Sequence, residues 1–177
     1  YSKNKFNECI SAIDKYKKEN YVEDWLDFRL TYLAIVCFEN LNDDNSAIKH
    51  IKYLENKNQN IEDFLKLSLL FRKMRALFNL KRFDELRQTI AFVKDQYPKS
   101  IDLIEINYLE SVLYYLQTNY NRASEIIKKI ENEKLTLHQQ RNLNILKSEI
   151  AIALNNDKRF ALDQFNKLST NFPNDAY

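Results

Sequence analysis

Apolar residues recur at steps of three and four positions along almost the whole chain, which is the spacing of one face of an α-helix. Within residues 61–80 the apolar positions extend beyond one face, as in a helix packed between neighbours. The pattern breaks at clusters of Asn and Asp and just before the two prolines. It predicts helices over residues 3–18, 22–40, 44–56, 61–79, 83–96, 101–117, 120–132, 137–154 and 158–171. Asn tolerates the left-handed backbone region, so we expect Asn to end helices where glycine is unavailable.

The openings of alternate predicted helices recur at a nearly constant interval. The matched positions are Cys9, Ala47, Leu86, Ala123 and Ala161. Successive matched positions are 38, 39, 37 and 38 residues apart, and each follows a longer helix and precedes a shorter one. The repeating unit is therefore a helical hairpin. The aromatic-proline pairs 97–98 and 172–173 each close a second helix and lie 75 residues apart, about two units.

These hairpins resemble the tetratricopeptide repeat, whose unit of about 34 residues forms two antiparallel helices. The positions that match the family pattern are Leu70, Met74, Leu77, Phe83, Ile90, Val93, Pro98, Ser111, Tyr114, Tyr120, Ala123, Ile127, Ile130, Ala161, Phe165, Leu168 and Pro173. The chain departs from the family in lacking glycine, in having Leu86 and Cys9 where alanine is usual, and in having longer loops. The resemblance implies an all-α fold, a right-handed superhelix of antiparallel helical hairpins, with three complete units between two half-units. Each hairpin would bury its apolar face only against its neighbours.

Composition excludes several classes of function. The chain has 177 residues, no glycine and two prolines, which removes the usual hairpin turns of β-proteins and every glycine-rich phosphate loop. A formal charge of +2 and a pI of about 8.4 disfavour a nucleic-acid partner. No apolar segment is long enough to cross a membrane, so we expect no membrane insertion. The chain opens on Tyr1 inside a helical pattern, and we expect residues 1–177 to be a single repeat domain cut from a longer protein.

Candidate catalytic and metal-binding groups are scattered along the chain. His50 and His138 have no partner at zinc-ligand spacing and are interpreted as surface or helix-boundary residues. Cys9 and Cys37 lie on consecutive predicted helices, where they either approach each other or serve as small buried residues. The acidic pairs at 43–44, 62–63 and 84–85 stand at helix starts, where carboxylates complement the helix dipole. The sequence therefore predicts no enzymatic activity, no metal site and no cofactor.

A local excess of basic residues is the first indication of a binding surface. Residues 66–87 contain seven basic and two acidic side chains, a balance of +5 within a chain of +2. Arg72 and Arg75 are three positions apart on one helix face and would form a fork for a carboxylate or a phosphate. This pattern predicts a partner with an acidic surface. The alternative is an ordinary solvated helix face.

The tetratricopeptide resemblance also implies which residues line a concave groove formed by the first helices. These positions are Arg29, Tyr32, Val36, Phe71, Arg72, Arg75, Phe78, Tyr108, Val112, Tyr115, Leu146 and Ile150. Tyrosine and arginine are enriched among the residues that anchor interfaces. The candidate partner-binding residues are therefore Arg72, Arg75, Tyr108, Tyr115, Tyr32, Arg29 and Phe78. The alternative is that the rings fill the core between hairpins.

These observations predict a non-catalytic scaffold that binds a protein or peptide segment in the groove. The second hypothesis is a repeat domain that senses a peptide or ligand and controls an effector domain outside this chain. The Lys/Asn clamp with which some family members hold a C-terminal carboxylate is absent, which disfavours binding of chaperone tails. The aromatic-proline endings resemble repeats of bacterial envelope proteins, which favours a periplasmic or membrane-anchored location over the cytoplasm.

Overall fold

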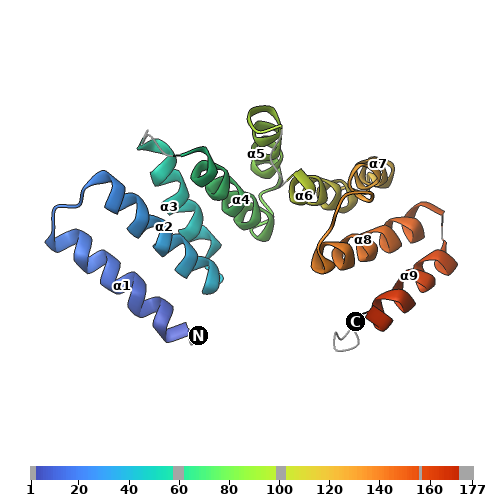
Figure 1. The fold of residues 1–177 in the computed structure, drawn as a ribbon, viewed down its shortest axis with the longest axis horizontal. Helices are drawn as coiled ribbons and strands as arrows, with labels where there is room; N and C mark the ends of the chain where they lie inside the picture. The colour runs from blue at the N-terminus through green and yellow to red at the C-terminus, as the bar shows by residue number, and fades with distance from the viewer. Residues whose placement is uncertain (1–2, 58–61, 99–102, 156, 172–177) are drawn as a thin grey trace. The chain divides into compact units, whose positions relative to one another are not determined.

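The fold is described by a computed structural model, which covers residues 3–57, 62–98, 103–155 and 157–171 (Figure 1). Every regular element in these ranges is an α-helix. The helices are α1 (Lys3–Glu19), α2 (Asp24–Asn40), α3 (Asp44–Asn56), α4 (Asp63–Asn79), α5 (Phe83–Gln96), α6 (Leu103–Leu116), α7 (Tyr120–Ile130), α8 (Leu137–Asn155) and α9 (Lys158–Asn171). They form two compact units, unit 1 (Tyr1–Asp95) and unit 2 (Gln96–Tyr177). Each unit is described by itself below.

The observed helix boundaries lie within two residues of those predicted from the sequence. The all-α class is confirmed for the described residues. The predicted helix starts at 61 and 101 and the aromatic-proline pair at 172–173 lie outside the described residues. The helix predicted to begin at residue 22 begins at Asp24, because Glu23 has an extended backbone with φ of −62° and ψ of 151°. Acidic residues occupy the first turns of α3, α4 and α5 as predicted, and Asp43 caps α3 by accepting a hydrogen bond from Ser46 N–H.

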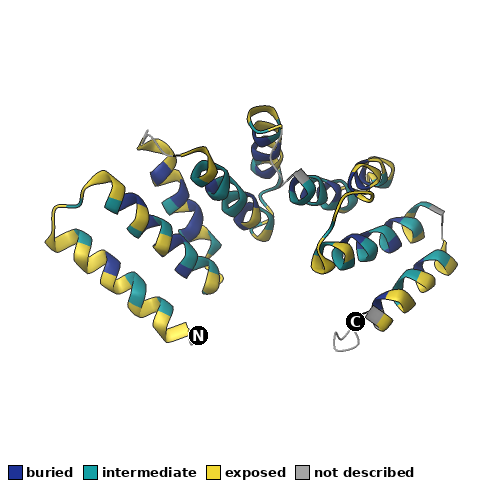
Figure 2. Ribbon diagram, in the orientation of Figure 1, coloured by how far each residue is buried: buried dark blue, intermediate teal, exposed yellow. Residues whose placement is uncertain are grey.

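In unit 1, successive helices from α1 to α4 pack on one another. The main core cluster consists of Phe28, Ile35, Ala47, Ile51, Leu54 and Leu69, which come from α2, α3 and α4. Figure 2 shows α1 largely exposed, with Ile13 buried. The helix α2 contacts α1 and α3 through its sides and shares the core with α4. This position explains why the buried residues of α2 are not confined to a narrow stripe of the helix.

Unit 2 has a corresponding core between its own helices. Packing joins α6 to α7, α7 to α8, and α8 to α9, and α6 also contacts α8. The core cluster consists of Ala123, Ile127, Ile130, Leu143, Leu146 and Ile150. Half-buried tyrosines pack against this cluster from α6 and from the start of α7. Unit 2 therefore buries its second helix, α7, against the two longer helices that precede and follow it in the chain.

Three hairpin turns reverse the chain on residues with left-handed backbones. Asn42, Lys81 and Thr118 have φ of 59°, 57° and 61°. In each turn the N–H of this residue donates to the carbonyl three residues earlier, and the next N–H donates to the carbonyl five residues earlier, the pattern of a Schellman motif. The hydrogen bonds that span five positions each have an N···O distance of 2.9 Å. They run from Asp43 N–H to Phe38 O, from Arg82 N–H to Leu77 O, and from Asn119 N–H to Tyr114 O.

The left-handed residues recur at intervals of 39 and 37 residues, which match the spacings of the aligned sequence segments. Five residues after each stands a buried residue of the second helix, namely Ala47, Leu86 or Ala123. The expectation that Asn takes the place of glycine is correct at Asn42 and wrong at the other two turns. A threonine at positive φ is costly because its branched Cβ crowds the backbone.

The two cysteines link α1 to α2 by packing and not by a disulfide. Both are free thiols, with Cys37 buried and Cys9 partly exposed. Burial, with a further contribution from a hydrogen bond to the Cys9 thiol, raises the pKa of Cys37 to about 11. The thiols therefore approach each other, as the first alternative predicted, and the second alternative is correct for Cys37 but not for the partly exposed Cys9.

Within the described ranges, no helix has both the length and the apolar content needed to cross a membrane.

Replacing Thr118 by glycine should stabilise the protein by about 1 kcal/mol, because glycine removes a left-handed penalty of roughly 1–2 kcal/mol and adds a smaller entropic cost. Urea unfolding of the full chain measures this change in the free energy of unfolding. Asn42→Gly should give a smaller gain, since Asn already tolerates this backbone. The neighbouring Gln117→Gly should destabilise, because no positive φ is found there. Equal effects at Thr118 and Gln117 would contradict the turn geometry.

Candidate functional site

Two neighbouring surfaces of unit 1 carry most of its polar chemistry. The first lies where α2 meets α4. The hydroxyl of Tyr32 is 2.8 Å from Ser68 Oγ, and Arg72 Nε donates to the same hydroxyl at 3.0 Å. The Arg72 guanidinium also lies over the Tyr32 ring, 4.9 Å from its centroid, and forms an ion pair with Glu39. These contacts fix α4 against α2 and use part of the donor capacity of Arg72.

The predicted fork of two arginines faces a carboxylate of the chain itself. Glu39 forms an ion pair with Arg72 and also interacts electrostatically with Arg75. Burial nevertheless raises the pKa of Glu39 above its ordinary value, against the lowering effect of both arginines. Its Oε1 atom is buried and has no hydrogen-bond partner among the described residues. Arg75 is exposed and makes no ion pair or hydrogen bond among the described residues, so its guanidinium is the accessible half of the fork.

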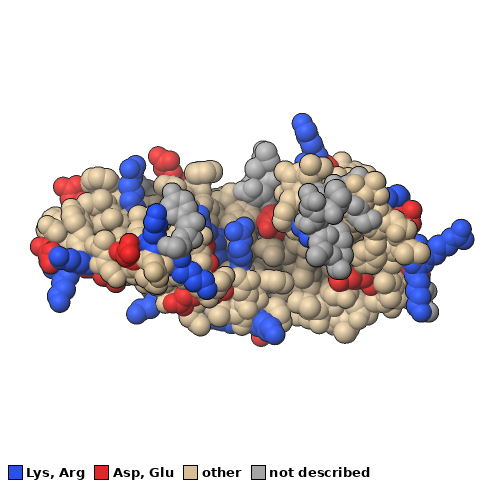
Figure 3. Space-filling view, turned by 90° about the horizontal axis from the view of Figure 1, so that it is seen from below, with Lys and Arg blue, Asp and Glu red and all other residues tan. Residues whose placement is uncertain are grey.

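Most of the basic excess in residues 66–87 is compensated by carboxylates in the folded unit. The ion pairs join Lys66 to Asp63, Arg72 to Glu39, Lys73 to Glu55, Arg82 to Glu85, and Arg87 to Asp84. Three of these carboxylates lie outside the counted segment. Arg75 and Lys81 have no ion pair among the described residues. Figure 3 accordingly shows blue and red side chains interspersed, so the positive character is local to a few side chains.

The sequence analysis missed the tryptophan of this surface. Trp25 opens α2 and is 58% exposed, and its Nε1 donates to Glu23 Oε2 at 2.5 Å. The guanidinium of Arg29, one turn further along, lies 5.7 Å from the Trp25 ring centroid. Phe64 stands in the first turn of α4, 39 residues after Trp25, and is 77% exposed. A signal existed, because Trp25, Arg29 and Tyr32 follow the i, i+4, i+7 spacing of one helix face.

We call this region the α2–α4 surface. It consists of Trp25, Arg29, Tyr32, Phe64, Arg72 and Arg75. Phe78 is also on α4, where it is half-buried and packs against Phe83 with ring centroids 6.4 Å apart. Tryptophan and arginine are the residue types most enriched at binding hot spots. The surface therefore combines exposed aromatic area with guanidinium donors.

The predicted groove residues of unit 2 are more deeply packed. Tyr108 and Tyr115 are half-buried against the core cluster of that unit. Burial, followed by nearby carboxylates, raises the pKa of both phenols. Leu146 and Ile150 are buried members of the cluster, which contradicts their prediction as groove residues. The cause is that α8 packs against both α6 and α7 and uses its apolar face for the core.

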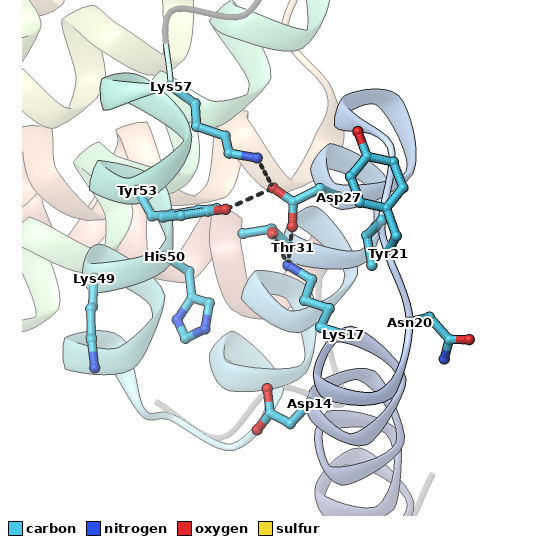
Figure 4. A pocket seen from close by; sticks show the side chains of 11 residues that line it. Asp14, Lys17, Asn20, Tyr21, Asp27, Thr31, Lys49, His50, Tyr53 and Lys57 are labelled. Carbon is cyan, nitrogen blue, oxygen red and sulfur yellow. Dashed lines mark hydrogen bonds and ion pairs between the residues drawn. The ribbon is translucent and has the colours of Figure 1, made fainter.

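The second surface is a cavity between α1, α2 and α3, centred on a buried carboxylate (Figure 4). Asp27 is 5% exposed. Its Oδ1 is 2.7 Å from Lys17 Nζ, and its Oδ2 is 2.8 Å from both Lys57 Nζ and the Tyr53 hydroxyl. Lys17 Nζ also donates to Thr31 Oγ1 at 2.5 Å. One carboxylate thus holds together three helices. Lys57 Nζ is also 3.3 Å from Asp24 Oδ1, so two carboxylates balance the two ammonium groups. We call this space, of about 500 Å³, the Asp27 cavity.

The electrostatics of the Asp27 cavity are dominated by these short contacts. Burial alone would raise the pKa of Asp27, yet hydrogen bonds from Lys17, Lys57 and Tyr53 lower it to about 2. The hydrogen bond to Asp27 raises the pKa of Lys57 although burial opposes this. Burial and the same carboxylate raise the pKa of Tyr53. All three groups therefore keep their ordinary charge states at neutral pH.

Sequence reasoning did not find this cluster, and it treated His50 as an ordinary surface residue. His50 lines the cavity, with Nδ1 2.8 Å from Ser46 O and its ring tilted against Phe38. The sequence signal that could have pointed to this cluster was Asp27, a carboxylate that lies on the buried face of the helix α2. Its partners are 10, 26 and 30 residues away, so only the fold identifies them.

Among the described residues, no group of three His, Cys, Asp or Glu side chains is arranged to hold a metal ion. Comparison with protein-family models, with curated proteins and with solved structures gives no match to this chain.

Asp27→Asn should destabilise the protein by about 2 kcal/mol at pH 7, because the ionised carboxylate is favoured in the folded state. The folded pKa is about 2 against an ordinary value of 3.8, so this stability is present above pH 4 and is lost as the pH falls toward 2. Urea unfolding of both proteins at neutral and acidic pH measures the difference. Asp14→Asn, an exposed change in the same cavity, should change stability by less than ~0.5 kcal/mol at either pH. A pH-independent loss in Asp27→Asn would contradict the assignment.

Proposed function

We propose that this chain is a non-catalytic interaction domain that binds a protein segment on the α2–α4 surface. The observation that carries the proposal is the exposed Trp25 beside Arg29, with the accessible guanidinium of Arg75 on the adjacent first helix. Aromatic rings supply rigid apolar contact area, and arginine supplies planar donors for carboxylates. The expected partner is a segment that carries acidic side chains next to apolar ones.

The proposed architecture is a tetratricopeptide-like array of hairpins that continues through residues 1–177 as a right-handed superhelix. Its support is the recurrence of one turn geometry at intervals of 39 and 37 residues, each followed by a buried residue at the same place in the second helix. Such an array buries the apolar face of each hairpin against its neighbours and leaves an outward stripe on each first helix. In this proposal the half-buried Phe78 contributes apolar contacts in unit 1, and the half-buried Tyr108 and Tyr115 contribute them in unit 2.

A second function is favoured by the Asp27 cavity. Its volume of about 500 Å³ falls in the range of roughly 300–1,000 Å³ that is usual for small-molecule sites. A repeat domain with such a cavity would sense a ligand and control an effector domain elsewhere in its protein. The two functions use different faces of α2 and are tested separately.

The α2–α4 surface is tested with peptides selected on the full chain from a random displayed library. Arg75→Glu should weaken the selected peptides by more than tenfold, about 1.4 kcal/mol, while helicity by circular dichroism stays unchanged. Arg72 is not used, because its ion pair with Glu39 and its hydrogen bond to Tyr32 fix α4 against α2, and a change there would disturb the fold. Trp25→Ala should weaken binding by a similar factor.

The matched control is Arg87→Glu on α5, an exposed arginine whose ion pair with Asp84 is 3.5 Å long. It should leave peptide affinity within about twofold of the wild type, since exposed pairs contribute little. The loss caused by Arg75→Glu should shrink as salt rises, because exposed charges are screened over about 10 Å at 0.1 M. The proposal that the α2–α4 surface is the binding site would be contradicted if the wild type and Arg75→Glu bound equally well, or if the selected peptides lacked acidic residues.

A further inference from the structure

The Asp27 cavity is lined by charged groups that keep hydrogen-bonding capacity after their contacts within the fold are made. Lys17 Nζ has three N–H donors and directs two of them to Asp27 and Thr31. Lys49 lines the cavity, is exposed and has no ion pair among the described residues. The third N–H of Lys17 is therefore available to a carboxylate that enters the cavity, and charge-assisted hydrogen bonds of this kind are strong. The side chain of Lys49 runs along α3, and its ammonium group is directed away from Lys17 (Figure 4).

An acceptor site stands across the same space. Asp14, one turn before Lys17 on α1, lines the cavity, and its carboxylate has no ion pair in the described part of the chain. Figure 4 shows Asp14 reaching from α1 toward α3, and the His50 ring reaching from α3 into the space between them. When neutral His50 donates through Nδ1–H to Ser46 O, its Nε2 is an acceptor. Asp14 and His50 can therefore both accept hydrogen bonds from a cationic donor.

We propose that the Asp27 cavity binds a small molecule that carries both a carboxylate and an ammonium group, as a free amino acid does. The carboxylate lies against Lys17, and the ammonium group lies against Asp14 and His50. This site is separate from the α2–α4 surface and does not depend on the function proposed for it.

The mixed lining is what selects a zwitterion. A simple anion would meet the Asp14 carboxylate, and a simple cation would meet the ammonium group of Lys17. A zwitterion satisfies both sets of groups at once. The cavity volume of about 500 Å³ accommodates such a molecule with its side chain. The rings of Tyr53 and of Tyr21, which is 93% exposed, provide apolar area for that side chain.

The inference is tested by NMR titration of the ¹⁵N-labelled full chain with each free proteinogenic amino acid. Two matched derivatives of every amino acid that binds are then titrated. The N-acetyl derivative lacks the ammonium group, and the decarboxylated amine lacks the carboxylate. Saturable shifts on α1 and α3 around the cavity are expected for at least one free amino acid. Both of its derivatives should bind at least tenfold more weakly, because each loses one charge-assisted contact.

Asp14→Asn separates recognition of the ammonium group from general effects on the fold. Asp14 is exposed and makes no ion pair among the described residues, so the variant should fold as the wild type does. It should weaken binding of the free amino acid at least tenfold and strengthen binding of the N-acetyl derivative, because that anion no longer meets a carboxylate. The control is Glu8→Gln, an exposed change on α1 outside the cavity lining, which should change neither.

Three results would overturn the inference. The first is the absence of saturable shifts with every free amino acid. The second is an N-acetyl derivative that binds as tightly as its parent, which would make the cavity a plain anion site. The third is an equal effect of Asp14→Asn and Glu8→Gln, which would show that α1 charge in general, and not the cavity, controls binding.

Discussion

Reversing direction without glycine is the constraint on which this structure depends. The chain has no glycine, so a turn that uses the left-handed region must place a residue with a side chain there. Asn42, Lys81 and Thr118 adopt this conformation, and each turn is held by the same pair of backbone hydrogen bonds. The turn determines where the second helix begins, and therefore which residue is buried five positions later. The turn therefore sets which residues of the first and second helix face each other in these three hairpins.

The position of α2 explains why both candidate sites are found in unit 1. This helix lies between α1 and α3 and also meets α4, so a polar side chain on it touches another helix in most directions. On one side Asp27 joins α1 to α3 and forms the base of a cavity. On another side Tyr32 and Glu39 hold Arg72 of α4. The remaining face of α2, which carries Trp25, Arg29 and Tyr32, begins with the exposed side chain of Trp25.

Local pattern was enough to predict the helices and much of the core, but not the sites. Met74, Leu77, Ile90 and Val93 are buried as the helical spacing indicates, because burial follows from position on a helix face. The charge count over residues 66–87 did not show how much of the positive excess remains accessible, since carboxylates elsewhere in the chain pair with Arg72 and Lys73. The Asp27 contacts and the Glu39–Arg72 pair join residues far apart in sequence, and only packing brings these groups together. Lys81 and Thr118 turn the chain because the hairpin demands it, against their own preference.

The most direct test is a measurement of the φ angles at the three turns in solution. Cross-correlated relaxation and scalar couplings, measured on the ¹³C,¹⁵N-labelled full chain, determine the sign of φ for each residue. The account predicts positive φ at Asn42, Lys81 and Thr118, with negative φ at the residues on either side. Negative φ at any of the three would show that the hairpins do not share one turn, and the repeated arrangement of first and second helices would fail with it.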